Sequence, residues 1–130
     1  MKILIIEDNH EFGQMLSTSL REAGFETDIA MSGREGIKSA LHYLPDLILL
    51  DYHLGDMTGY DVALGIKCMG KTARIPFIVL SSLAADPLLI GGFKKLPSCR
   101  GALAKTQTFE EILGAIRNIF SAASDEQDSP

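Results

Sequence analysis

Three acidic residues lie directly after short apolar runs, and their side chains are the ones best placed for chemistry. Glu7 and Asp8 follow Ile3-Leu4-Ile5-Ile6, and Asp51 follows Leu47-Ile48-Leu49-Leu50. Runs of consecutive large apolar residues are typical of parallel strands that are buried on both faces. The carboxyl ends of such strands meet at one edge of the sheet, where open α/β folds bind ligands. Aspartate is also common in turns, so Asp51 alone leaves a site and a turn as alternatives.

Two further strand ends add a hydroxyl group and an amine. Ser81 follows the apolar run 76–80, and Lys105 follows a short run of small residues, 101–104. Each residue has an ordinary explanation when it is taken alone: a helix cap, a turn or a solvated charge. Their joint position at the ends of four predicted strands favours a functional site, because these ends lie near the point where the winding direction switches. We therefore expect one shallow cleft that contains Glu7, Asp8, Asp51, Ser81 and Lys105.

Three carboxylates in one cleft repel one another, which raises one or more of their pKa values. A divalent cation relieves this repulsion, and oxygen ligands without nearby His or Cys favour Mg²⁺ or Mn²⁺. Magnesium keeps several waters and leaves a face open to phosphate, so a carboxylate beside it can attack phosphorus and form an acyl phosphate. In that reaction the metal, Lys105 and the Ser81 hydroxyl would bind the three phosphoryl oxygens.

The segments between the apolar runs have helical periodicity, and the alternation of strands and helices predicts an α/β fold with a doubly wound parallel sheet and helices on both faces. Residues 25–30 alternate apolar and polar side chains, which predicts a half-exposed edge strand. Capping-box spacing begins helices at Ser32 and Thr108. The residues expected on the inner faces of the helices are Phe12, Met15, Leu16, Leu20, Ala23, Ile37, Ala40, Leu41, Leu44, Val62, Ala63, Ile66, Met69, Ile112, Leu113, Ile116, Ile119 and Phe120.

Two segments are less regular. In residues 83–100, Asp86-Pro87 can begin a helix, but Gly91-Gly92 and Pro97 interrupt it, so we expect a short or broken fourth helix. From Ser121 the chain is rich in Ser, Ala, Asp, Glu and Gln, which predicts a disordered tail or the start of a linker over residues 121–130. The folded domain is accordingly expected to cover residues 1–120.

Composition limits the classes of function. The 130 residues suit one domain, and the formal net charge of −5 argues against direct nucleic acid binding, which needs a basic surface. Cys68 and Cys99 lack metal-ligand spacing and are expected to be packed, reduced thiols. The first apolar run is too short for a signal peptide, and no run approaches the ~20 residues needed to cross a bilayer. We therefore expect a cytoplasmic protein that does not bind membranes.

These motifs together resemble the receiver domain of two-component response regulators, over roughly residues 1–120. The resemblance implies a flavodoxin-like strand order, 2-1-3-4-5, and a phosphorylation-dependent signalling switch. Asp51 would accept a phosphoryl group from a histidine kinase or phosphotransfer protein, Lys105 would pair with the phosphate, and Ser81 would move towards it. The segments that carry the resemblance are Lys2–Asn9, Pro45–Asp51, Met57–Asp61, Ile78–Ser81 and Ala104-Lys105.

The resemblance also implies a metal site and a set of partners. Asp8 and Asp51 would ligate Mg²⁺ together with the backbone carbonyl of His53, while Glu7 would act through a bound water. The His53 side chain could influence how water reaches the acyl phosphate, although an exposed loop histidine is the simpler interpretation. Any enzymatic activity would be weak autophosphorylation and autodephosphorylation. Further expected partners are a downstream effector domain or protein and, through the surface of residues 83–120, a second copy of the chain.

Three departures from the family pattern affect how a signal would leave the domain. Gly55 and Thr106 occupy positions where the family usually has proline, and Ala102 occupies the position of its switch aromatic. Atypical output coupling is therefore expected, and the alternative is a receiver-like interaction module that binds its partner independently of phosphorylation. A phosphohydrolase fits poorly, because those enzymes need a second acid two residues after the nucleophile, where this chain has His53.

Overall fold

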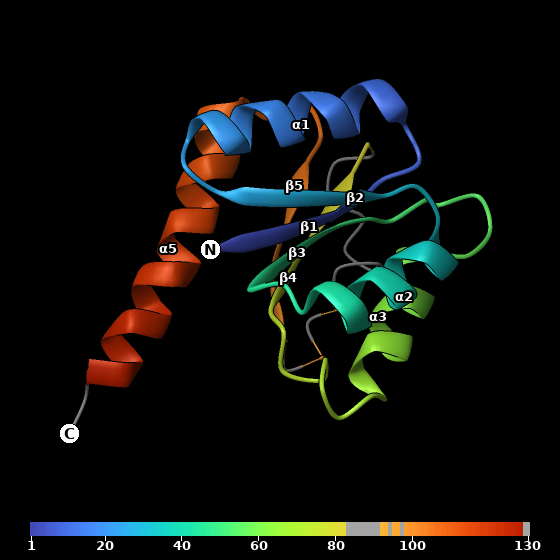
Figure 1. Cartoon of the computed structure of the whole chain (residues 1–130). Coiled ribbons are helices and arrows are strands. Elements are labelled where there is room, and N and C mark those ends of the chain that lie inside the picture. Colours follow the sequence, from blue (N-terminus) through green and yellow to red (C-terminus); the bar gives the residue numbers. More distant parts are fainter. Residues whose placement is uncertain (83–91, 94, 97, 129–130) are drawn as a thin grey trace.

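Five parallel strands lie side by side at the centre of the molecule in the order β2-β1-β3-β4-β5 (Figure 1). The structure is a computed structural model of the chain, and it describes residues 1–82, 92–93, 95–96 and 98–128, with side chains as far as Ser121. All neighbouring strands pair in parallel, which confirms the doubly wound sheet and its predicted order. The strands are β1 (Lys2–Ile6), β2 (Glu26–Ala30), β3 (Leu47–Asp51), β4 (Phe77–Ser81) and β5 (Cys99–Ala104).

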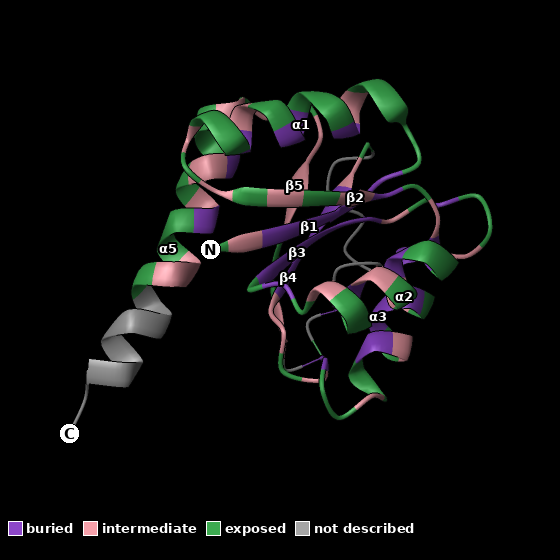
Figure 2. Ribbon diagram, viewed as in Figure 1, coloured by how far each residue is buried: buried purple, intermediate pink, exposed green. Residues whose placement is uncertain are grey.

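Helices cover both faces of this sheet, because successive residues of the central strands point to opposite sides. On one face, α1 (His10–Glu22) and α5 (Phe109–Asp128) pack against side chains such as Ile5 and Leu49. On the other face, α2 (Gly33–Tyr43) and α3 (Gly59–Lys67) pack against the alternate side chains, such as Ile6 and Leu50. Figure 2 shows the result: buried residues follow the central strands and the helix sides that face them.

Side-chain caps begin the helices, and two of these caps, Ser32 and Thr108, are the residues that the sequence predicts. Asn9 accepts a hydrogen bond from the Phe12 amide and caps α1. Thr58 and Asp61 form a reciprocal capping box at α3, and Thr108 and Glu111 exchange the same pair of bonds at α5. At α2 the predicted box is only half formed, since the Ser32 hydroxyl caps the helix but the Glu35 carboxylate accepts from the Met31 amide.

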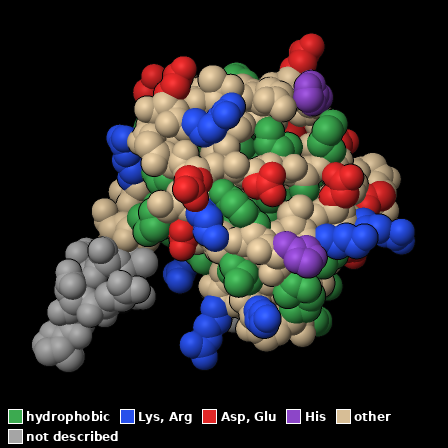
Figure 3. Space-filling view, viewed as in Figure 1, with side chains coloured by type: hydrophobic (Ala, Val, Ile, Leu, Met, Phe, Trp, Pro, Cys, Tyr) green, Lys and Arg blue, Asp and Glu red, His purple; other side chains and the backbone are tan. Residues whose placement is uncertain are grey.

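The edge strand β2 has the predicted alternation. Glu26 and Asp28 are exposed, whereas Ala30 is buried. Charged side chains on an edge strand hinder pairing with another chain. Figure 3 shows the face of the molecule on this side, where acidic and basic side chains are interspersed with apolar ones. The edge is therefore protected by charge.

The inner faces of α1 and α2 are narrower than predicted. Met15, Leu41 and Leu44 are 48%, 37% and 44% exposed, so their assignment to the core was wrong. Small residues also lie against the sheet: Gly13 and Ser17 are buried in α1 together with Leu16 and Leu20, and a Cβ atom on Gly36 would lie 2.7 Å from Ile6. Close approach through small residues narrows the stripe of each helix that the sheet can cover.

The carboxyl-terminal helix is longer than predicted. The backbone of α5 continues to Asp128, across most of the segment 121–130 for which a disordered tail or linker was expected. Alanine, glutamate and glutamine, which are good helix formers, occur in this segment, and the segment contains no proline before residue 130. The helix can therefore continue. The predicted short or broken fourth helix falls largely on residues 83–91, 94 and 97, outside the described residues.

Candidate functional site

The carboxyl ends of four strands bring the predicted site residues to one edge of the sheet. Asp51 is the last residue of β3, and Glu7 follows the last residue of β1. Ile6 pairs with Leu50 in the sheet register, which places Glu7 and Asp51 side by side on adjacent strands. One carboxylate oxygen from each of Glu7, Asp8 and Asp51 lies within 4.8 Å of the others. The predicted acidic cluster is therefore present.

Lys105, which directly follows β5, extends its side chain into this cluster. Its Nζ atom lies 2.8 Å from Oε1 of Glu7 and 3.2 Å from Oδ1 of Asp51, so one ammonium group bridges both carboxylates. The same Nζ atom lies 5.2 Å from the centre of the Phe12 ring. A cation over an aromatic face is attracted by the ring quadrupole. The sequence predicted the ammonium–carboxylate set, but it assigned Phe12 only to the core.

Burial gives these charges unusual proton affinities. Glu7 and Asp51 are 1% and 2% exposed. The pKa of Glu7 is raised to about 7: burial is the largest cause, the Lys105 hydrogen bond opposes it, and the nearby Asp51 charge adds to the increase. Burial likewise raises the pKa of Asp51. Burial alone would lower the pKa of Lys105, but the hydrogen bond and charge of Glu7 and the charge of Asp51 outweigh it, so this pKa is raised.

The donor set fits a hard divalent cation. Within the described part of the chain, Oε2 of Glu7 is buried without a hydrogen-bond partner, while Oε1 accepts from both Lys105 and the Asn9 amide. A buried carboxylate oxygen without a partner is costly, and a cation or its water would satisfy it. Asp8 is exposed, so the cluster opens to solvent on its side. Oxygen ligands of this kind suit Mg²⁺, which normally uses one or two carboxylates and keeps several waters.

The loop after Asp51 approaches the cluster through its backbone. The His53 amide donates to Oδ1 of Asp51 at 3.3 Å, and His53 forms an isolated antiparallel bridge with Thr58 across the loop. The His53 side chain is exposed and lies edge-on to Tyr52, with 4.7 Å between ring centres. His53 is thus beside the cluster, and the use of its carbonyl as a metal ligand stays a prediction.

Ser81 ends β4 next to the strand that leads to Lys105. Ser81 pairs with Ala104 in the register, and its carbonyl accepts a hydrogen bond from the Lys105 amide at 2.9 Å. The two residues predicted to contact a phosphoryl group from one side therefore lie on adjacent backbone segments. Their contact with phosphate stays a prediction.

Residues 3–117 match the family described as the response regulator receiver domain. The chain belongs to this family. It is 34% identical over 120 residues to the probable transcriptional regulatory protein SilR of Salmonella typhimurium, a match that covers 92% of this chain and 51% of that protein. It is 32% identical, with the same coverage, to the transcriptional regulatory protein CusR of Escherichia coli K12. The receiver chain thus spans about half the length of these curated relatives.

Solved receiver structures have the same fold. The chemotaxis response regulator CheY4 of Vibrio cholerae is 25% identical, with a TM-score of 0.83 and coverage of 91% of this chain and 97% of that chain. A putative response regulator from Chloroflexus aurantiacus is 28% identical, with a TM-score of 0.82 and coverage of 92% and 97%. Together with the sequence match, these structures confirm the predicted family and place the receiver in two-component signalling.

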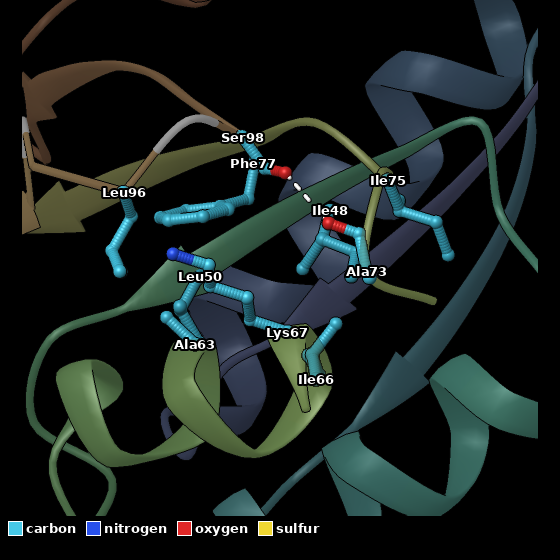
Figure 4. A pocket seen from close by; sticks show the side chains of 10 residues that line it. All are labelled: Ile48, Leu50, Ala63, Ile66, Lys67, Ala73, Ile75, Phe77, Leu96 and Ser98. Atoms are coloured by element: carbon cyan, nitrogen blue, oxygen red, sulfur yellow. Dashed lines mark hydrogen bonds between the residues drawn. The ribbon is translucent and has the colours of Figure 1, made fainter. Parts of the chain in front are cut away.

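A separate small pocket, whose lining contains none of the acidic cluster, lies beside β3, β4 and α3 (Figure 4). Its walls are mostly apolar side chains from β3, β4 and α3, such as Ile48, Phe77 and Ile66. Ser98 closes part of it by donating to the Ala73 carbonyl at 2.8 Å. This pocket lacks the carboxylates that phosphoryl chemistry needs, so the acidic cluster is the candidate site. Within the described residues, no helix is long and apolar enough to span a bilayer.

Proposed function

We propose that this receiver domain accepts a phosphoryl group on Asp51 from a histidine kinase or phosphotransfer protein and acts as a signalling switch. The observation that carries the proposal is the bridge from Lys105 to Glu7 and Asp51, at 2.8 and 3.2 Å, inside the cluster of three carboxylates. Such a cluster combines a nucleophile, a fixed cation and a place for a second cation in one cleft. The expected domain covers residues 1–120, and the expected location is the cytoplasm.

In the proposed reaction, one Asp51 carboxylate oxygen forms a bond to phosphorus while the bond from phosphorus to the donor's imidazole nitrogen breaks, and that nitrogen keeps the electron pair. Lys105 neutralises charge on the transferred group, and the Ser81 hydroxyl donates to one of its oxygens. Asp8, Asp51 and the His53 carbonyl would hold Mg²⁺ or Mn²⁺, with Glu7 acting through a water. The metal supplies charge neutralisation when it is bound. Intrinsic autophosphorylation and autodephosphorylation are expected to be weak.

Atypical output coupling is part of the proposal. Ala102 provides no aromatic ring next to Ser81, but four rings pack together on the same face of the sheet. Phe93 lies edge-on to Tyr52, Tyr60 and Phe77, with ring centres 5.9, 5.4 and 6.2 Å apart. Because Tyr52 directly follows Asp51, this cluster supports a route from the site to the effector or to a second copy of the chain.

A phosphorylation assay tests the main proposal. The protein is incubated with acetyl phosphate and Mg²⁺, and intact-mass spectrometry measures the fraction that carries one added phosphoryl group. We expect modification of the parent, none of Asp51→Asn, and none of the parent after chelation of the metal. An unmodified parent, or equal modification of Asp51→Asn, would contradict the proposal.

The second candidate is a receiver-like interaction module whose partner binds regardless of phosphorylation, and Ala102 is the observation that favours it. A pulldown with and without the phosphoryl analogue beryllofluoride separates the two candidates. Recovery of a partner only with the analogue supports the switch. Equal recovery under both conditions supports the interaction module.

A further inference from the structure

Helix α2 begins on a carboxylate that belongs to a distant part of the chain. The amides of Gly33 and Arg34 donate to Oδ1 and Oδ2 of Asp56, at 2.9 and 3.1 Å, across more than twenty residues of sequence. The next amide, at 35, donates to the Ser32 hydroxyl, and the amide at 36 makes the first regular helical bond, to the Ser32 carbonyl. The first four amides of a helix have no partner within the helix. Asp56 therefore accepts from two of the amides at the start of α2 that have no partner within the helix.

The residue after Asp56 also packs against the start of α2. A Cβ atom added to Gly33 would clash with Cγ of Met57, so glycine leaves room for this side chain. Both side chains of the pair 56–57 therefore dock the loop between β3 and α3 onto α2. The position of this loop is therefore set by two features of α2: the amides of residues 33 and 34, which bind Asp56, and the space beside Gly33, which Met57 fills.

The docked loop is the one that carries His53. Only Leu54 and Gly55 separate His53 from Asp56, and the Asp56 amide donates to the Leu54 carbonyl at 2.7 Å. Gly55, at the position where the family usually has proline, has a φ of +75°. Proline cannot adopt this conformation, so its rigid ring does not restrain the loop here. A displacement at Asp56 would therefore reach His53 through a short and tightly turned backbone.

We propose that Asp56 is a positioning residue for the metal site: by binding the first two amides of α2, it fixes the loop that presents the His53 carbonyl to Mg²⁺. Asp56 itself does not contact the metal in this account. The hydrogen bonds from Gly33 and Arg34 to Asp56 replace the restraint that proline gives to this loop in other receivers. The inference rests on the proposed function, because it assumes that the acidic cluster binds Mg²⁺.

The test compares two variants that remove acceptors from the same helix. Asp56→Ala removes the loop's bonds to α2, and Ser32→Ala removes the local cap bond to the Glu35 amide and leaves the loop in place. Mg²⁺ dissociation constants are measured from the amide NMR shifts of Tyr52 and His53, at low and high salt. We expect Asp56→Ala to raise the dissociation constant roughly tenfold, as is typical when a partner that orients a ligand is lost. Ser32→Ala should lower the unfolding temperature similarly and leave the dissociation constant unchanged.

Asp56→Asn distinguishes positioning from charge and serves as a second variant if the alanine protein does not fold. It loses the charge but keeps one acceptor oxygen, so its dissociation constant should lie closer to that of the parent. Equal constants for Asp56→Ala and the parent would overturn the inference, as would equal effects of both alanine variants. An effect that disappears at high salt, or that is as large in Asp56→Asn, would also overturn it, since charge alone would then explain it. A parent that shows no saturable Mg²⁺ binding would refute the proposed function instead.

Discussion

The centre and the β5 edge of the sheet differ in how firmly they hold the residues at their ends. In β1 and β3, the residues that precede Glu7 and Asp51 are 0–1% exposed from Ile3 to Ile6 and from Leu47 to Leu50. In β5, which leads to Lys105, every residue is partly or fully exposed, and the register with β4 shifts between Phe77 and Val79. The carboxylates thus extend from a fully packed core, whereas the lysine extends from an irregular edge strand.

This difference bears on two parts of the proposed function: phosphoryl transfer at Asp51 and the movement that follows it. Fixed carboxylates suit a metal site, because ligands must keep their spacing when a cation binds. Movement after phosphorylation is more readily accommodated where packing is sparse, at β5 and its neighbours. Ala102 removes the ring that such movement usually repositions, and the contact between Phe93 and Tyr52 lies on the same face of the sheet. We infer that the centre fixes the nucleophile and the metal ligands, and that the edge, which also carries Lys105, accommodates the movement that produces the output.

The largest expected effect concerns stability at the centre. Leu50→Ala should lower the free energy of unfolding by about 3 kcal/mol, because it leaves a cavity at a fully buried position. Leu103→Ala in the partly buried β5 should cost about 1 kcal/mol. Urea unfolding measures both values. Equal costs would show that the two parts of the sheet are packed alike and would remove the basis of the comparison.

The next prediction concerns Lys105, the residue that links the edge to the centre. Lys105→Met should slow phosphorylation by acetyl phosphate about 100-fold, the usual loss when one donor to a developing charge is removed. The rate is measured by intact-mass spectrometry over time. Lys71→Met, at an exposed lysine outside the site, is the control and should react at the parental rate. A Lys105 variant that also reacts at the parental rate would leave the lysine without a role in transfer.

Acidity should weaken metal binding through the buried centre. The pKa of Glu7 is raised to about 7, so protons compete with Mg²⁺ below that pH, and the apparent affinity should fall about tenfold per pH unit. In the metal-free protein, the effect of pH on folding stability runs in the opposite direction to its effect on metal affinity. A raised pKa means that the folded protein binds the proton more tightly than the unfolded chain, so the Glu7 contribution is present below about pH 4.5 and is lost as pH rises through about 7. Mg²⁺ titrations at pH 6, 7 and 8 check the predicted fall in metal affinity, and an affinity independent of pH would contradict it.

The smallest effect is expected at the aromatic cluster. Phe93→Leu should change the phosphorylation rate less than about twofold, because leucine keeps this buried position apolar and the ring packs against other rings outside the acidic cluster. It should reduce the amide NMR shift changes that beryllofluoride produces in β5. Phe25→Leu is the matched control, since Phe25 stacks on Phe120 at 5.9 Å on the opposite face of the sheet. Unchanged shifts in β5 for Phe93→Leu would exclude this cluster from the output route.

Local patterns predicted the sheet and the cluster well, because strand ends and caps depend on neighbouring residues. The run before Asp51 and the capping box at Thr108 are examples. Contacts between distant segments left no local pattern to read. Asp56 lies more than twenty residues from the amides that it binds, and Phe12, which contacts Lys105, lies near the other end of the sequence. Apolar residues such as Met15 were placed inside because periodicity does not show how much of a helix the sheet can cover.

The most direct test of the account is to identify the phosphorylated residue chemically. Borohydride reduction converts an aspartyl phosphate into homoserine, which peptide mass spectrometry can locate in the sequence. After reaction with acetyl phosphate and Mg²⁺, we predict homoserine at position 51 and unmodified aspartate at positions 8 and 56. Homoserine at another aspartate, or at none, would contradict the central claim that Asp51 is the phosphoacceptor.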